Sequence, residues 1–265
     1  MYLACRTQMF WDKYSIPECI RRGRKLGFEG LEICLENKNF DVMQNMLEDS
    51  MIKEITAECR TQAFRKISVS CHSDFVHNDT VFCFLKRAIP KIRDFGSEVF
   101  VLGGVFKAHG CREDPGWEEE SKIYQERIYQ LSQIAEKFDV KLAPEPEINC
   151  ILRTTQDYID LADAVSSPAL CINFDVGHAF LTDDDPIAMI RKLGKRIVHV
   201  HFDNMLKGWH NHQLLTQGDM DLAQYLSAFR SIGYDGIIAL DLYKHDIEKV
   251  AAVCLDEFNR LIELI

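Results

Sequence analysis

The chain has 265 residues, of which 47% are hydrophobic and 27% charged, enough to bury a large core in two small domains or in one α/β barrel. The net charge of −10 repels phosphate backbones, and no cluster of Lys and Arg alternates with aromatic residues, so nucleic acid is not an expected partner. No apolar run approaches the length of a membrane span, and the first residues lack the pattern of a signal sequence. We therefore expect a cytoplasmic protein without a membrane partner. Its ten cysteines are scattered without a CxxC pair, as reduced, buried thiols would be.

Short apolar or β-branched runs alternate with longer stretches of helical period along the whole chain. The expected strands are residues 2–6, 29–35, 66–72, 98–103, 140–145, 169–175, 196–201 and 236–242. The expected helices are residues 15–26, 41–62, 79–95, 119–137, 155–165, 185–193, 221–232 and 246–263. Eight of each is the count of a (β/α)8 TIM barrel. No linker divides the chain, so we predict a single barrel domain over residues 1–265.

Four expected strands in the second half each end in a side chain that can bind a metal ion. They are Glu145 in VKLAPE, Asp175 in LCINFD, His201 in IVHVH and Asp241 in IIALD. In barrel enzymes the active site lies at the carboxyl ends of the strands, so these side chains predict one shared site. A mixed carboxylate and imidazole set suits a divalent ion; we favour Mn²⁺ because carboxylates prefer harder ions, with Zn²⁺, Co²⁺ and Mg²⁺ as alternatives.

Each of these assignments has a purely structural alternative. Asp175 and Asp241 could cap the turns that follow them. His199 points to the same face as His201, and a strand histidine is often only a hydrogen-bonded core residue. Glu147 competes with Glu145, which we favour because Pro146 marks the end of the strand.

Other candidates lie at the same end of the predicted barrel. His72 closes KISVSCH and Glu32 lies in GFEGLEIC, so both extend the pattern into the first half. His72 could contact substrate or stabilise a turn, and Glu32 could contact substrate or tie loops together. Residues 105–121 form the longest stretch without a predicted element, which suggests a lid in which Phe106 or Trp117 packs on a substrate; an ordinary exposed loop is the alternative.

Several motifs resemble the xylose isomerase-like (AP endonuclease family 2) barrels in their order and spacing. They are GFEGLE, the histidine that ends strand three, EPE, FDVGH, VHVHFDN and GYDGIIALD, and the resemblance covers nearly the whole chain. Its sugar epimerases and inosose isomerases hold one divalent ion with Glu, Asp, His and Glu from strands five to eight. The resemblance therefore implies a metal site of Glu145, Asp175, His201 and Asp241. Asp241 departs from the usual glutamate and is one methylene shorter, so either the backbone approaches more closely or a water fills the gap.

The resemblance also implies the chemistry. An isomerase or epimerase removes a proton beside the carbonyl of a ketose or an inositol-derived ketone, and a divalent ion stabilises the enediolate that results. It assigns the proton transfers to Glu145 and Asp241, and substrate contacts to His178 and His212. His212 could equally be a solvated loop histidine. We expect a small sugar or polyol substrate, and family members often form homo-oligomers.

Three alternatives remain open at the level of sequence. A lyase or dehydratase of the inosose or dehydroshikimate type also begins with proton abstraction beside a carbonyl. The AP endonuclease-like phosphodiesterases need a histidine at the end of strand four, where this chain has Leu102, Gly103 and Gly104. They also need a DxH motif after strand seven, where it has His210-Asn211-His212. The third alternative is a noncatalytic barrel that acts as a binding or partner subunit, and loss of the metal ligands would be its sign.

Overall fold

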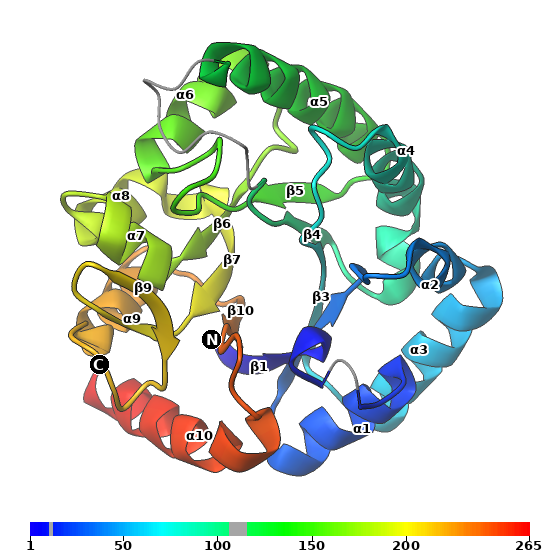
Figure 1. Cartoon of the computed structure of the whole chain (residues 1–265). Helices are drawn as coiled ribbons and strands as arrows, with labels where there is room; N and C mark the ends of the chain where they lie inside the picture. The colour runs from blue at the N-terminus through cyan, green and yellow to red at the C-terminus, as the bar shows by residue number, and fades with distance from the viewer. Residues whose placement is uncertain (11–12, 106–115) are drawn as a thin grey trace.

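The computed structural model describes residues 1–10, 13–105 and 116–265. Eight parallel strands form one sheet that curves around a central axis, with helices outside it (Figure 1). Their order in the sheet is β5-β4-β3-β2-β1-β10-β7-β6. The strands are β1 (Tyr2–Arg6), β2 (Gly30–Cys34), β3 (Lys66–Cys71), β4 (Val99–Leu102), β5 (Lys141–Pro144), β6 (Ile172–Asp175), β7 (Ile197–Phe202) and β10 (Ile237–Leu240).

The two outermost strands of this order, β5 and β6, also meet. A parallel bridge pairs Leu142 with Leu170. Leu142 N donates to Ala169 O, and Cys171 N donates to Leu142 O, both at 2.8 Å. The sheet is thus a nearly closed barrel, which confirms the predicted (β/α)8 architecture.

Helices follow the strands in the expected alternation. They are α1 (Ile16–Leu26), α2 (Phe40–Met46), α3 (Asp49–Thr61), α4 (Asp79–Ala88), α5 (Trp117–Lys137), α6 (Thr155–Val165), α7 (Val176–Thr182), α8 (Pro186–Leu193), α9 (Leu222–Ser231) and α10 (Ile247–Leu264). No helix among the described residues is long and apolar enough to span a bilayer.

Two predicted helices are interrupted in the structure. The helix expected over 41–62 is two helices, because the backbone of Glu48 between α2 and α3 is extended, with φ −70° and ψ 137°. The helix expected over 79–95 continues beyond α4 as a 3-10 helix, η2 (Ile89–Phe95). Pro90 explains this change, because proline lacks the N–H that an α-helix needs at that position.

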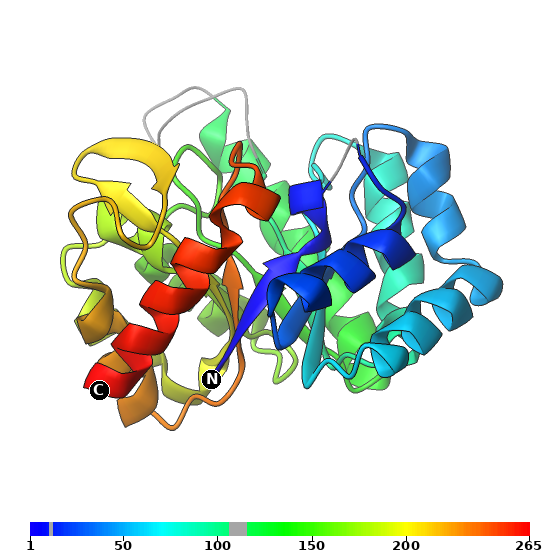
Figure 2. The same cartoon turned by 90° about the horizontal axis from the view of Figure 1, so that it is seen from below.

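Other elements were not predicted, among them a short helix and a hairpin near the strand tips. The short helix α7 begins directly after β6, and an antiparallel hairpin of β8 (Asn204–Leu206) and β9 (Trp209–Gln213) follows β7. Figure 2 shows this hairpin at the opposite end of the barrel from the N terminus. The hairpin therefore stands at the end of the barrel that holds the strand tips.

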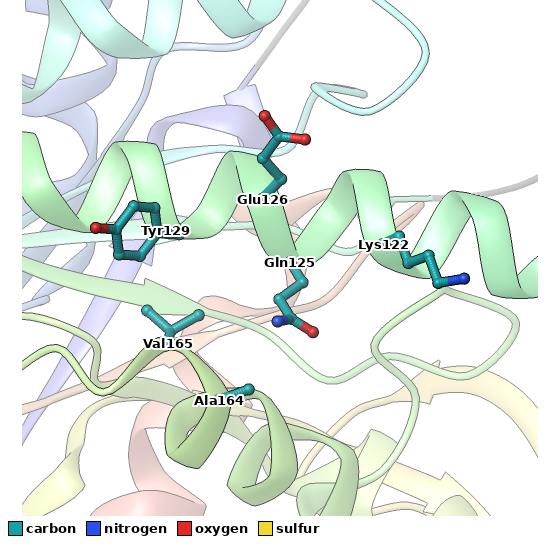
Figure 3. Close-up of a pocket in the computed structure, with 6 residues that line it drawn as sticks. All are labelled: Lys122, Gln125, Glu126, Tyr129, Ala164 and Val165. Atoms are coloured by element: carbon teal, nitrogen blue, oxygen red, sulfur yellow. The ribbon is translucent and has the colours of Figure 1, made fainter.

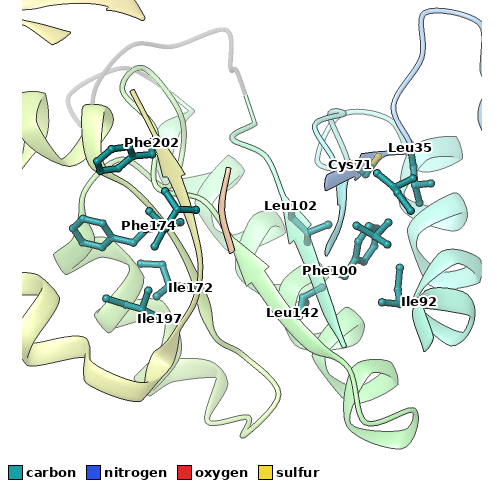
Figure 4. Packing of buried hydrophobic residues seen from close by; sticks show 14 of the residues in the cluster. Leu35, Cys71, Ile92, Phe100, Leu102, Leu142, Ile172, Phe174, Ile197 and Phe202 are labelled. Carbon is teal, nitrogen blue, oxygen red and sulfur yellow. The ribbon is translucent and has the colours of Figure 1, made fainter. Parts of the chain in front are cut away.

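Large apolar side chains fill the space between the barrel and its helices. Figure 4 shows two parts of this layer, one with Ile172 and Phe174 and the other with Ile92 and Phe100. All four side chains are almost completely buried. Burying such a side chain contributes about 1.5–3 kcal/mol, so this outer layer is the main source of stability.

The inside of the barrel is lined by small and polar residues instead. Ala4 and Ala239 form one small buried cluster with Ile237, and Val101 and Ala143 belong to another. Side chains alternate along a strand, so the residues two positions further along point the same way at the strand tips. The small residues leave room above them for the longer polar side chains of the site.

Candidate active site

The four predicted metal ligands come together at the carboxyl ends of the strands. Glu145, Asp175, His201 and Asp241 each offer one ligand atom, and these atoms lie within 4.8 Å of one another. The pairing of β6 with β7 places Asp175 opposite His201. The side chain of Asp241 is 13% exposed, and those of the other three are at most 2% exposed.

One of these residues, Asp175, presents a buried atom, Oδ2, that lacks a hydrogen-bond partner among the described residues. His201 Nδ1 lies 3.1 Å from Glu145 Oε2, inside the cluster. Asp175 Oδ1 accepts from the backbone N–H of His178 at 2.7 Å, so Asp175 caps α7 with one oxygen and keeps the other free. His201 Nε2 lies 3.0 Å from Glu32 Oε2, which leaves Nδ1 facing the other ligands. A buried polar atom is normally paired, and a metal-binding histidine normally contacts a carboxylate through its other nitrogen, so the site fits a divalent ion.

The charges of the cluster shift the pKa values of two of its carboxylates in opposite directions. Burial, together with the neighbouring charge of Glu145, raises the pKa of Asp175 to about 7. Burial alone would raise the pKa of Glu145 as well. The nearby His201 and His72 outweigh this effect of burial and hold the pKa of Glu145 well below its usual range. A divalent ion would favour the charged form of both carboxylates.

Glu145 is held by a chain of hydrogen bonds that runs down into the barrel. Asn173 Nδ2 donates to Glu145 Oε2 at 3.0 Å, and Asn173 Oδ1 lies 2.9 Å from His199 Nδ1. His199 Nε2 in turn lies 2.9 Å from Ser68 Oγ. Burial lowers the pKa of His199 to about 3, so this ring is neutral. His199 is thus a hydrogen-bonded support beneath the site, whereas His201 faces the ligand cluster.

Glu32 and His72 also reach the cluster. The fully buried Glu32 bridges His201 and Arg6, whose Nε donates to Glu32 Oε1 at 2.9 Å. His72 Nε2 lies 3.1 Å from Glu145 Oε2, and the His72 side chain is 18% exposed. Glu32 therefore ties site residues together, and His72 is open enough to meet a substrate. Their substrate contacts stay predictions.

Glu147 lies beside Glu145 and points into the same region. One oxygen of Glu147, one of Glu145 and one ring nitrogen of His178 lie within 4.8 Å of one another. Burial and the charge of Glu145 raise the pKa of Glu147 to about 8. Glu147 is therefore mostly protonated at neutral pH and can donate a hydrogen bond.

Glycines after β4 make room for these side chains. A Cβ atom on Gly103 would overlap the ring of His72, and one on Gly104 would overlap the carboxylate of Glu147. We expect Gly103→Ala to displace His72 and to lower the free energy of unfolding by about 1–3 kcal/mol, the usual effect of overpacking. Thermal and denaturant unfolding measure this change, and an unchanged stability would mean that His72 can move at no cost.

Three histidines form a second cluster beside the first. One ring nitrogen each of His178, His210 and His212 lies within 4.8 Å of the others. Asp203 Oδ2 lies 2.7 Å from His212 Nδ1, so the second nitrogen of His212 is the one available to a ligand. This cluster could also hold a metal ion. Strand β9 brings His210 and His212 to it, which explains why sequence reasoning that lacked the hairpin could not place them.

A hollow of about 340 Å³ lies beside the four-residue cluster. It is lined by Gln8, Met9, Phe10, Lys13 and residues 241–246. Asp241 thus belongs both to the cluster and to the wall of the hollow. We expect a substrate to approach Asp241 from this side.

Two other hollows lie between α5 and α6. Figure 3 shows one, of about 270 Å³, whose lining residues include Lys122 and Tyr129. The other, of about 290 Å³, is lined by Trp117, Ile151 and other residues. Trp117 is the first residue of α5, and its contact with a substrate stays a prediction. Phe106 and most of the proposed lid, residues 106–115, lie outside the described residues.

Solved structures share this fold over their whole length. D-psicose 3-epimerase of Clostridium cellulolyticum superimposes with a TM-score of 0.80 at 15% identity and covers 99% of each chain. The IOLI protein with a bound zinc atom superimposes with a TM-score of 0.77 at 18% identity and covers 99% of this chain and 98% of its own. At these identities the likeness establishes the fold.

Sequence comparison gives the same result. The chain is 21% identical to the inosose isomerase of Bacillus velezensis over 259 residues, which cover 91% of this chain and 88% of the relative. The model of the xylose isomerase-like TIM barrels matches residues 20–260. The strand order, the cluster at the strand tips and this match lead to one conclusion: the chain belongs to the xylose isomerase-like TIM barrel family.

Proposed function

We propose that the chain, acting as one domain, is a divalent-metal-dependent isomerase or epimerase of a ketose or an inositol-derived ketone. The observation that carries the proposal is the convergence of Glu145, Asp175, His201 and Asp241, in which the buried Asp175 Oδ2 has no hydrogen-bond partner among the described residues. The activities named for its relatives, an inosose isomerase and a sugar 3-epimerase, support the same class of reaction. We expect a small sugar or polyol as substrate.

In this reaction Glu145 removes the proton beside the carbonyl. Asn173 and His72 both contact Glu145 Oε2, so they orient the carboxylate for the transfer. When bound, the metal ion supplies Lewis-acid stabilisation of the enediolate. Asp241 lines the hollow and is the second proposed proton-transfer group. Against the effect of burial, Arg6 holds the pKa of Asp241 well below its usual range, so the proton that Asp241 delivers to the carbon is first taken from solvent. His178, His212, Glu32 and Trp117 complete the set of proposed substrate contacts.

The metal ion is proposed to be Mn²⁺. Three carboxylates and one imidazole form an oxygen-rich set, which favours a harder ion than a thiolate site would. The zinc in the IOLI structure supports a divalent ion in this kind of barrel. Elemental analysis of the purified protein distinguishes Mn²⁺ from Zn²⁺, Co²⁺ and Mg²⁺.

Solvent exchange at carbon tests the reaction itself. Incubation of the metal-loaded protein in D₂O with a panel of ketoses and inososes should put deuterium on the carbon beside the carbonyl of the true substrate and release an isomer. Mass spectrometry and NMR detect both. Loss of water from the substrate instead would assign the chain to the dehydratases, and a panel without any exchange would contradict the proposal.

The phosphodiesterase alternative meets a steric obstacle. The phosphodiesterases need a histidine at the end of strand four, where this chain has Leu102, Gly103 and Gly104, and at the two glycines even a Cβ atom would overlap His72 or Glu147. The net charge of −10 also repels a nucleic acid backbone. These observations favour carbohydrate chemistry over phosphodiester cleavage.

Metal uptake should depend on pH. Without metal, Asp175 has a pKa of about 7, and the pKa of His201 is raised by the carboxylates Glu145 and Glu32 against the effect of burial. Both must lose a proton to bind a metal ion, so we expect Mn²⁺ affinity to rise from pH 6 to pH 8 and proton release to be larger at pH 6. Calorimetry in two buffers of different ionisation enthalpy counts the protons. Asp175→Asn should release fewer, and equal counts in both proteins would contradict this assignment.

A further inference from the structure

The last residue of β1 is a buried arginine that contacts three residues of the candidate site. Arg6 is only 2% exposed. Its Nε donates to Glu32 Oε1 at 2.9 Å, its Nη1 lies 2.6 Å from Asp241 Oδ1, and its Nη2 lies 3.2 Å from both ring nitrogens of His72. Burying a guanidinium is costly unless the surrounding groups compensate its charge, and here the carboxylates of Glu32 and Asp241 do so.

The barrel gives Arg6 its place through strand register. Arg6 pairs with Glu32 of β2, and Ala4, two residues before it, pairs with Ala239 of β10. Asp241 follows Ala239 by two residues, so Arg6 and Asp241 point to the same side of adjacent strands. The short side chains of Ala4 and Ala239 leave space beneath the stem of the arginine.

The two carboxylate oxygens of Asp241 have different contacts. Oδ1 is bound by Arg6, while Oδ2 lies 3.7 Å from His201 Nδ1 and faces the other ligands. The guanidinium of Arg6 therefore lies against the β1 side of Asp241.

We propose that Arg6 is a positioning residue that holds Asp241 as the fourth metal ligand, so that the lengths of the two side chains are matched to each other. The inference rests on the proposed metal site. The guanidinium reaches Asp241 Oδ1 from β1, whereas the shorter side chain of a lysine with the same charge would stop short of it. The reach of the arginine thus fixes where Asp241 lies and where its Oδ2 points.

A swap of side-chain lengths tests this pairing. Asp241→Glu pushes a longer acid against the arginine, and Arg6→Lys keeps the charge but draws the donor away from the aspartate. We expect each single variant to weaken Mn²⁺ binding roughly tenfold to a hundredfold, the usual effect of losing a group that orients a ligand. The double variant Arg6→Lys/Asp241→Glu restores the combined length, and we expect its Mn²⁺ affinity to return to within about threefold of the parent, because coupled neighbours do not add.

Titration of the metal-free proteins with Mn²⁺, followed by calorimetry or electron paramagnetic resonance, measures these affinities without any substrate. Circular dichroism and thermal unfolding show that each variant is folded. Single variants that bind as the parent does, or a double variant as weak as the product of the two singles, would overturn the pairing and leave the metal site standing. A parent protein that takes up no Mn²⁺ would overturn both proposals. If Arg6→Lys does not fold, Asp241→Glu alone decides, since parental affinity in that variant contradicts a matched length.

Discussion

Replacing Glu145 by glutamine should reduce solvent exchange at the substrate carbon by about a hundredfold to ten-thousandfold, the range expected when a general base is lost. Glutamine keeps the shape of the side chain and can still contact Asn173 and His72, but its amide cannot accept the proton. Deuterium incorporation in the presence of saturating Mn²⁺ measures the loss. Saturation matters because the amide is also a weaker metal ligand, and a fall in exchange caused by metal loss would recover as the concentration of Mn²⁺ rises.

Glu147→Gln is the matched control for this experiment. Glu147 is buried two residues away from Glu145, and its pKa of about 8 keeps it mostly protonated at pH 7. A neutral glutamine therefore resembles its existing state, and we expect a much smaller loss of exchange. If Glu147→Gln is the more damaging substitution, the proton transfer belongs to Glu147 and the role given to Glu145 is wrong.

The strand tips were predictable because their arrangement follows from a local pattern. Apolar runs that end in Glu145, Asp175, His201 and Asp241 alternate with helical stretches, and parallel strands in a barrel all end on one face. The barrel and the meeting of the four side chains therefore required no information about long-range contacts. The alternation of side chains along a strand could not choose between His201 and His199, because residues two apart on a strand share a face.

The hydrogen-bond partners of those side chains were beyond sequence reasoning. Arg6 contacts Asp241, 235 positions away in the chain, and Asn173 connects Glu145 to His199 across three strands. Such partners depend on the register and closure of the barrel, which one sequence does not encode in any short segment. A charged residue at the end of the buried run LACR was the available signal for Arg6, since a charge at a barrel strand tip faces the site more often than the core.

The hairpin of β8 and β9 was missed for a related reason. Its second strand, WHNHQ, is largely polar, and it lies in a stretch where a loop was expected. Hydrophobic periodicity cannot reveal a strand that packs over a polar site. The hairpin is nonetheless what carries His210 and His212 to His178, so part of the site depends on an element without a sequence signature.

Metal binding should stabilise the fold through the same four ligands. Mn²⁺ at a hundredfold to a thousandfold excess over its Kd stabilises a protein that binds it only when folded by about 2.7–4.1 kcal/mol. For a chain of this size that corresponds to a rise in Tm of roughly 5–15 °C over the chelated protein. Differential scanning calorimetry with and without Mn²⁺ measures the rise.

His201→Asn should remove most of this rise, because His201 supplies the imidazole of the four converging ligands. His77→Asn is its control: His77 is an exposed histidine paired with Asp74 at the start of α4, and its loss should leave the metal-induced rise unchanged. The comparison is made within each variant, so any change in the Tm of the metal-free protein cancels. A full rise in His201→Asn would place the stabilising ion elsewhere, and loss of that rise in His212→Asn would assign it to the cluster of His178, His210 and His212.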